Sequence, residues 1–452
     1  MRELLSVGTP SEAHRRHPVV FRMPVLFMLV LMFVVPKLLG YSQLVQMTPV
    51  QKWIYIVVSD IVPGILVFLW VRRNCSRRDS SRTDSLYPGM DPLLTIRFCA
   101  CLMVLFGHFF FVIFAPPVQL TSSGIIYRLA MSSPWAGVWI FFTLSGYLMG
   151  KGFFSGRYIT DQNGIAKFYF NRAIRIYPIY IFALGAQWVF LSPEIFRPEN
   201  LWGLFQSAML DDNRWIAVGA LWSVTTEFQF YLLAPFIAMA IDALAAKRGV
   251  GVWSILIVVM LGLSISIGLA NIHDWDMNVL VHGVYSPLGP NLYMFVSGMV
   301  LAKMIAQKKT HVGHRWAFLG IPFFITVVLV LTLWISYTGY GKPLLALGKY
   351  WVYAPPLAVL GTLATIWIFE TGEKIERGFT FYVVRSTQYG GTITYCLYAF
   401  HSQLMEQVRK IAPATLAPHS ELFYLPLVIA LVWAVSHFFY KMVEVPLSAN
   451  RR

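Results

Sequence analysis

The chain has 452 residues, of which 57% are hydrophobic, 16% aromatic and only 13% charged. Soluble domains carry about 25% charged residues, so the composition excludes a soluble globular protein and indicates a polytopic membrane protein. The formal net charge of +15 would suggest nucleic-acid binding in a soluble chain. In a membrane protein, basic residues gather on the cytoplasmic side instead, and we expect no nucleic-acid partner.

Apolar runs bounded by polar turns recur along the whole chain, and each is long enough to cross a bilayer as a helix. They fall at about 19–39, 53–71, 93–115, 135–151, 176–191, 219–244, 253–270, 284–304, 316–337, 351–369, 392–411 and 422–443. The sequence therefore predicts an all-α, polytopic membrane protein with about 12 transmembrane helices. The four cysteines follow no metal-binding spacing, so we expect no metal site.

The distribution of basic residues predicts the orientation. With the N-terminus inside the cell, about 25 of the 36 Lys and Arg fall in inner loops and about nine in outer loops. We expect an integral protein of the cytoplasmic (inner) membrane with both termini cytoplasmic. The polar segment 72–92 is interpreted as a linker between a two-helix N-terminal segment, residues 1–92, and a ten-helix domain, residues 93–452.

Arg97 and His108 are two polar residues within one apolar run, LLTIRFCACLMVLFGHFF. Eleven residues of α-helix turn through roughly 1100°, so the two side chains lie about 20° apart on one face, with an axial separation of about 16.5 Å. Arg97 is then near the cytoplasmic surface, where it can also snorkel to lipid headgroups. His108 is near the middle of the membrane, where an imidazole is a natural general base. The alternative for His108 is a structural histidine hydrogen-bonded to a neighbouring helix.

Two further intramembrane residues reach a similar depth. Glu227 lies about 12 Å along a helix that enters from outside, and a charged carboxylate there should face protein, a cavity or a cation. A glutamate that orients a histidine base is a recurrent pairing. His401 lies about 13 Å along a helix that enters from the cytoplasm, and structural and functional interpretations of it are equally favoured.

Arg172 and Arg175 lie three residues apart at the predicted cytoplasmic mouth, so they share a helix face. Arginines bind phosphates well through planar, bidentate hydrogen bonds. The alternative is that they are ordinary positive-inside residues.

From about Leu93 to the C-terminus, the sequence resembles the acyltransferase-3 family of integral membrane acyltransferases. The segments that carry the resemblance occur in family order: Arg97 with His108, FFTLSG at 141–146, RAIRIYP at 172–178, LWSVTTEFQFY at 221–231, TYCLYAFH at 394–401 and VEVP at 443–446. The chain departs from the family pattern in its two extra N-terminal helices, and in Val445, where a basic residue often follows the glutamate.

The resemblance implies transfer of an acyl group, often acetyl, from acyl-CoA to a hydroxyl of a sugar or glycoconjugate such as a cell-surface polysaccharide. Acetyl-CoA or another acyl-CoA is then a donor substrate, and no cofactor is bound. The expected partners are membrane lipid, acyl-CoA and a glycan or glycolipid acceptor, and the oligomeric state is left open.

Site roles follow from the same resemblance. His108, Glu227 and Arg97 are expected to be catalytic, and Arg97, Arg172 and Arg175 to bind the donor. Ser223, Trp222, Tyr231 and His401 are expected to bind substrate.

Two forms of the reaction remain open. In one, the acceptor hydroxyl attacks the thioester directly; in the other, a protein group first carries the acyl group across the membrane. We favour the direct form because no serine or cysteine lies in a recognisable nucleophile motif. The alternatives to an enzyme are a transporter of a small solute or glycolipid, although no internal repeat supports it, and a scaffold or sensor that retains the fold without chemistry.

Overall fold

The computed structural model describes residues 90–113, 125–190, 219–272, 286–307, 315–339, 352–372, 378–411 and 421–448, together with five residues between 62 and 70. Every regular element in these ranges is a helix, which confirms the predicted all-α fold. The helices are α4 (Pro92–Ile113), α5 (Ile125–Phe154), α6 (Gln162–Phe190), η5 (Gly219–Leu221), α9 (Trp222–Arg248), α10 (Val252–Ile272), α12 (Leu288–Gln307), η7 (Arg315–Leu319), α13 (Gly320–Gly339), α15 (Ala354–Thr371), α16 (Phe379–Ile411), α17 (Glu421–Phe439), the π-helix η8 (Tyr440–Glu444) and α18 (Val445–Ser448).

Seven helical segments in the described ranges are long and apolar enough to cross a membrane, so the predicted count of twelve is not confirmed. They comprise α4, α9, α10, α12, α13, α15 and the run from α17 to α18. The predicted spans at 135–151, 176–191 and 392–411 overlap α5, α6 and α16, which are not among these seven segments. The predicted span 19–39 lies outside the described residues, and 53–71 is described at only five positions, all of them helical.

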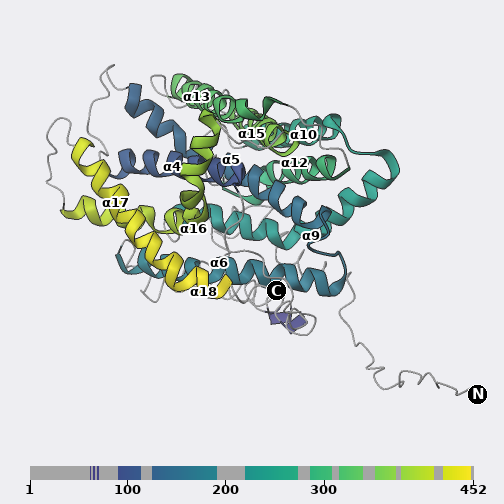
Figure 1. Ribbon diagram of the computed structural model, residues 1–452, viewed down its shortest axis with the longest axis horizontal. Coiled ribbons are helices and arrows are strands. Elements are labelled where there is room, and N and C mark those ends of the chain that lie inside the picture. The colour runs from purple at the N-terminus through teal and green to yellow at the C-terminus, as the bar shows by residue number, and fades with distance from the viewer. Residues whose placement is uncertain are drawn as a thin grey trace, which may run out of the picture.

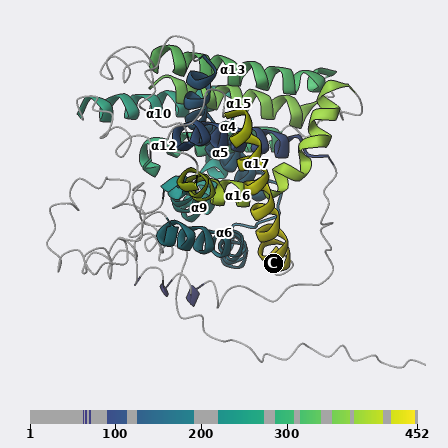
Figure 2. The same ribbon diagram turned by 90° about the vertical axis from the view of Figure 1, so that its left-hand side faces the viewer.

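Helices α4 and α5 lie in the middle of the bundle (Figure 1). Helices α13 and α15 lie on one side of this pair and α6 on the other, an order that the view turned by 90° also shows (Figure 2). Helix α12 packs against α5, and α16 packs against α4. The residues that α4 and α5 carry are therefore enclosed by other helices.

Asp91 determines where α4 begins and also attaches this end of the helix to α16. Its side-chain Oδ1 accepts a hydrogen bond of 2.9 Å from the Leu93 amide, as N-cap residues do, and Pro92 occupies the first helical position, where no amide donor is needed. The Gln388 side chain of α16 accepts from the Asp91 amide at 2.9 Å and donates to the Asp91 carbonyl at 3.0 Å.

The contact between α4 and α16 continues further along both helices. The hydroxyls of Thr95 and Thr387 are hydrogen-bonded at 2.7 Å. Gly391 lies against the backbone of Leu94 so closely that a Cβ atom would collide with it. Small residues allow such close backbone packing between helices in lipid.

Helices α5 and α12 approach each other even more closely. A Cβ atom added to Gly146 would overlap the carbonyl group of Phe295, and one added to Gly298 would overlap the backbone of Thr143. Gly150, four residues after Gly146, would meet Ala302 at 2.8 Å in the same way. The GxxxG pair at 146 and 150 is thus a helix-packing motif of the kind found in membrane bundles.

Replacing Gly146 by Ala should therefore destabilise the bundle, because backbone atoms of Phe295 cannot yield as a side chain would. Overpacking costs about 1–3 kcal/mol in free energy of unfolding. Thermal unfolding of the purified protein in detergent measures the loss. The matched control is Gly268→Ala on α10, where a Cβ atom meets nothing within 4 Å. Equal melting temperatures for the two variants would contradict this account of the α5–α12 contact.

Candidate active site

A cavity of about 250 Å³ lies between α4, α5, α6, α9 and α16. Aromatic and aliphatic side chains form much of its wall, and polar side chains from all five helices point into it. The polar lining residues are Asp91, Arg97, Ser145, Arg157, Tyr158, Arg172, Arg175, Ser223, Glu227, Tyr231, Thr394, Tyr395 and Tyr398. A concave apolar pocket with a few convergent polar groups is typical of a small-molecule site.

Four arginines and two acidic residues line this cavity, so its lining carries an excess of positive charge. Among the described residues, none of the four guanidinium groups lies within 4 Å of a carboxylate. Arg172 is only 9% exposed, and its Nε atom is buried without a hydrogen-bond partner. Guanidinium groups without a carboxylate partner around a cavity favour an anionic ligand, and phosphate above all.

The predicted pairing of Arg172 and Arg175 on one face of α6 agrees with this geometry, since both line the cavity. Tyr158, in the loop between α5 and α6, lies beside Arg172 and Arg157. Burial raises the pKa of the Tyr158 hydroxyl, but the two guanidinium groups lower it, and the net pKa is below its ordinary value. This edge of the cavity is therefore strongly electropositive.

Glu227 supplies a carboxylate inside the same cavity. Ser145 of α5 and Tyr231, one turn further along α9, both donate hydrogen bonds to its Oε1 atom. Its Oε2 atom has no hydrogen bond among the described residues. The carboxylate is thus oriented by two hydroxyls and keeps one oxygen open to the cavity.

His108 forms its hydrogen bond with another histidine, and neither of the two is among the residues that line the cavity. Its Nδ1 atom lies 2.7 Å from Nε2 of His401, whose own Nδ1 lies 2.7 Å from the carbonyl oxygen of Tyr398. His401 is completely buried, whereas His108 is partly exposed. The expected Glu227–His108 pairing is not among the hydrogen bonds of either residue.

Tyr398 lies between the cavity and the histidine pair. Its ring lines the cavity and lies 5.5 Å, centroid to centroid, from the ring of His401. Its hydroxyl donates to the carbonyl of Ala220 at 3.1 Å, so Ser223 is the donor in the 2.5 Å bond between the Ser223 and Tyr398 hydroxyls. The cavity thus ends at a hydrogen-bonded Ser223–Tyr398 pair.

The structure distributes the other expected substrate-binding residues over different environments. Ser223 and Tyr231 line the cavity. Trp222 does not line the cavity; its ring packs edge-to-face on Phe142, with ring centroids 6.3 Å apart. Its immediate contacts are those of a core residue.

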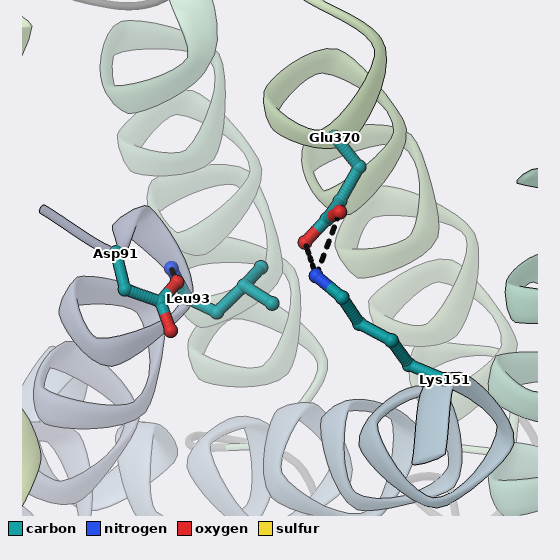
Figure 3. Close-up of polar contacts among 4 residues, drawn as sticks. All are labelled: Asp91, Leu93, Lys151 and Glu370. Atoms are coloured by element: carbon teal, nitrogen blue, oxygen red, sulfur yellow. Dashed lines mark hydrogen bonds and ion pairs between the residues drawn. The ribbon is translucent and has the colours of Figure 1, made fainter. Parts of the chain in front are cut away.

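Asp91, at the start of α4, is one of the lining residues. Figure 3 shows its bond to the Leu93 amide, beside the Lys151–Glu370 ion pair. Burial raises the pKa of Asp91, and this effect exceeds the lowering by the Leu93 amide and by Lys151. Lys151, at the end of α5, forms an ion pair of 2.6 Å with Glu370 of α15. Lys151 does not line the cavity, so the cations of the lining, among the residues that the structure describes, are the four arginines.

Sequence reasoning did not assign Ser145, Tyr398 or Arg157 to the site. Ser145 belongs to the FFTLSG segment, and Tyr398 precedes His401 by one helical turn. The signal that identifies Ser145 is its bond to Glu227, 82 positions away. A contact between residues so far apart cannot be read from spacing.

Comparison with protein families finds an acyltransferase domain at residues 93–437. This match covers more than half of the chain and includes all of the cavity-lining residues except Asp91. Comparison with curated proteins and with solved structures gives no match. The match and the membrane-spanning helices together identify the chain: it belongs to the acyltransferase-3 family and is an integral membrane acyltransferase that transfers groups other than amino-acyl groups.

Proposed function

We propose that this protein is an O-acyltransferase that moves an acyl group, preferably acetyl, from acyl-CoA to a hydroxyl of a sugar or glycoconjugate such as a cell-surface polysaccharide. The observation that carries the proposal is the arginine-lined cavity. Coenzyme A carries a diphosphate and a 3′-phosphate, and Arg97, Arg172 and Arg175 offer guanidinium groups without carboxylate partners within 4 Å. The basic inner loops support a cytoplasmic mouth for this cavity, an inner-membrane location and cytoplasmic termini.

The size of the cavity bears on how the donor binds. Its volume of about 250 Å³ is at the low end for a site that encloses a whole drug-sized ligand, for which about 300–1,000 Å³ is usual. We infer that it holds the pantetheine arm and acyl group, with phosphates at the arginines and the adenosine outside. The arm then places the thioester at the Ser223–Tyr398 end of the cavity. These two side chains separate the cavity from His108, so the thioester reaches the base only when they move apart.

The reaction is a direct acyl transfer. His108 removes the proton from the acceptor hydroxyl as the hydroxyl oxygen attacks the thioester carbonyl carbon. A carbon–oxygen bond forms, the carbon–sulfur bond breaks, and the departing thiolate takes the proton from the His108 imidazolium. Glu227, held by Ser145 and Tyr231, contributes a fixed negative charge that orients the arginines around the donor. Arg97, together with Arg172 and Arg175, binds the phosphates of the acyl-CoA donor.

Replacing His108 by Ala should abolish acyl transfer while the protein still accumulates in the membrane, because a general base contributes about 10²–10⁴-fold to rate. The measurement uses membranes of the native host as the source of acceptor and radiolabelled acetyl-CoA as donor, and it follows label in the carbohydrate fraction. An active His108→Ala enzyme would refute the base assignment. Transport of an unmodified solute by the wild type, without label transfer, would favour a transporter instead.

Replacing Arg175 by Gln should raise KM for acetyl-CoA by about tenfold or more, since a hydrogen bond to a charged group is worth about 1.5–3 kcal/mol. The same variant should use S-acetyl-N-acetylcysteamine, a thioester without phosphates, as well as the wild type does. Arg248→Gln on α9 is the matched control, because Arg248 is exposed and does not line the cavity. Equal penalties on both donors would contradict phosphate recognition by Arg175.

A further inference from the structure

The structure places a second histidine behind the proposed base. We propose that His401 is a positioning residue that fixes the tautomer of His108, so that the lone pair of His108 Nε2 is the one presented to the acceptor hydroxyl. The inference rests on the proposed function, because it assigns a role within that reaction. It replaces the expectation that His401 contacts the substrate.

The first step of the argument is the proton on His401. Its Nδ1 atom lies 2.7 Å from the carbonyl oxygen of Tyr398. A carbonyl oxygen can only accept a hydrogen bond, so Nδ1 of His401 must carry a hydrogen and donate it.

The second step is the charge state of His401. The residue is 0% exposed, and among the described residues its hydrogen bonds are to His108 and the Tyr398 carbonyl, neither of which is a carboxylate. An unpaired buried cation is costly, so the ring is neutral. A neutral imidazole with a hydrogen on Nδ1 has only a lone pair on Nε2.

The third step transfers this constraint to His108. The Nε2 lone pair of His401 accepts at 2.7 Å from Nδ1 of His108, so Nδ1 of His108 carries the hydrogen. The ring centroids are 4.9 Å apart and the ring planes differ by only 24°, as expected when the bond lies close to both planes. The lone pair of neutral His108 is therefore on Nε2.

The remaining question is whether that lone pair is available. His108 is partly exposed, and its Nε2 atom has no hydrogen-bond partner among the described residues. Both nitrogens of His401, in contrast, are occupied by Tyr398 and His108. An acceptor hydroxyl can thus reach His108 Nε2, while His401 has no ring nitrogen left for a substrate.

The arrangement also affects the charged intermediate. When His108 Nε2 takes the hydroxyl proton, the imidazolium keeps its Nδ1 hydrogen bond to His401, which becomes charge-assisted and stronger. The proton then passes from Nε2 to the departing CoA thiolate, and the pair returns to its starting state. His401 neither gains nor loses a proton in this cycle.

The test compares two substitutions at position 401 that differ in one property. His401→Gln retains an acceptor oxygen that can take the His108 hydrogen bond, whereas His401→Phe has similar bulk and no acceptor. For histidines that bind metals, loss of the outer hydrogen-bond partner costs about 10- to 100-fold in affinity or activity, and we take the same range for a histidine base. We expect His401→Phe to lose about that much kcat with an unchanged KM for acetyl-CoA, and His401→Gln to recover most of it. A purely structural role would lower the yield of both variants and would show no such selectivity.

A second readout does not depend on turnover. Nitrogen-15 shifts of labelled histidine in the intact wild-type protein distinguish the two neutral tautomers, with His108→Ala used to assign the signals. A protonated Nδ1 and a bare Nε2 on His108 support the inference, and the opposite tautomer overturns it. If His108→Ala is inactive while His401→Phe has full activity, only the role of His401 fails. If His108→Ala is active, the proposed base itself fails.

Discussion

The close contact between α5 and α12 determines where the cavity residues lie. Gly146 faces the backbone of Phe295, and Ser145, the preceding residue, directs its hydroxyl to Glu227 on α9. A side chain at position 146 would separate the two helices and move Ser145 away from the carboxylate. The FFTLSG segment therefore combines a packing residue and a cavity residue at adjacent positions. It contributes to the site although none of its residues is charged.

The polar groups of the site are divided by charge between two regions. The guanidinium groups lie at the cavity, where Glu227 and Asp91 offset part of their charge. The histidines lie beyond Tyr398, where a neutral pair satisfies its own hydrogen bonds. This division follows from the cost of burying charge in the membrane, since unpaired ions are expensive there and neutral hydrogen-bonded rings are not. The acyl-CoA donor has the same division, since its phosphates are anionic and its thioester end is neutral.

Much of the fold could be predicted because apolar runs of span length specify helices with little ambiguity. The predicted spans 135–151, 176–191 and 392–411 overlap α5, α6 and α16, but each helix begins 10 to 14 residues before the predicted start, because polar residues extend these helices beyond the apolar run. The shared face of Arg172 and Arg175 was also predictable, because it depends only on the geometry of one helix. The partners of Glu227 and His108 were not, because they lie on other helices and depend on tertiary packing.

The helix α4 is continuous from Pro92 to Ile113 and is held to α16 near both ends, by Asp91 with Gln388 and by His108 with His401. The axial distance from Arg97 to His108, about 16.5 Å, cannot change unless the helix itself breaks. Helix α4 therefore acts as a molecular ruler. For a donor whose phosphates bind at Arg97, this distance sets the length of arm that brings the thioester carbonyl to His108. A donor with a shorter or longer arm would place its carbonyl away from the base, whatever acyl group it bears.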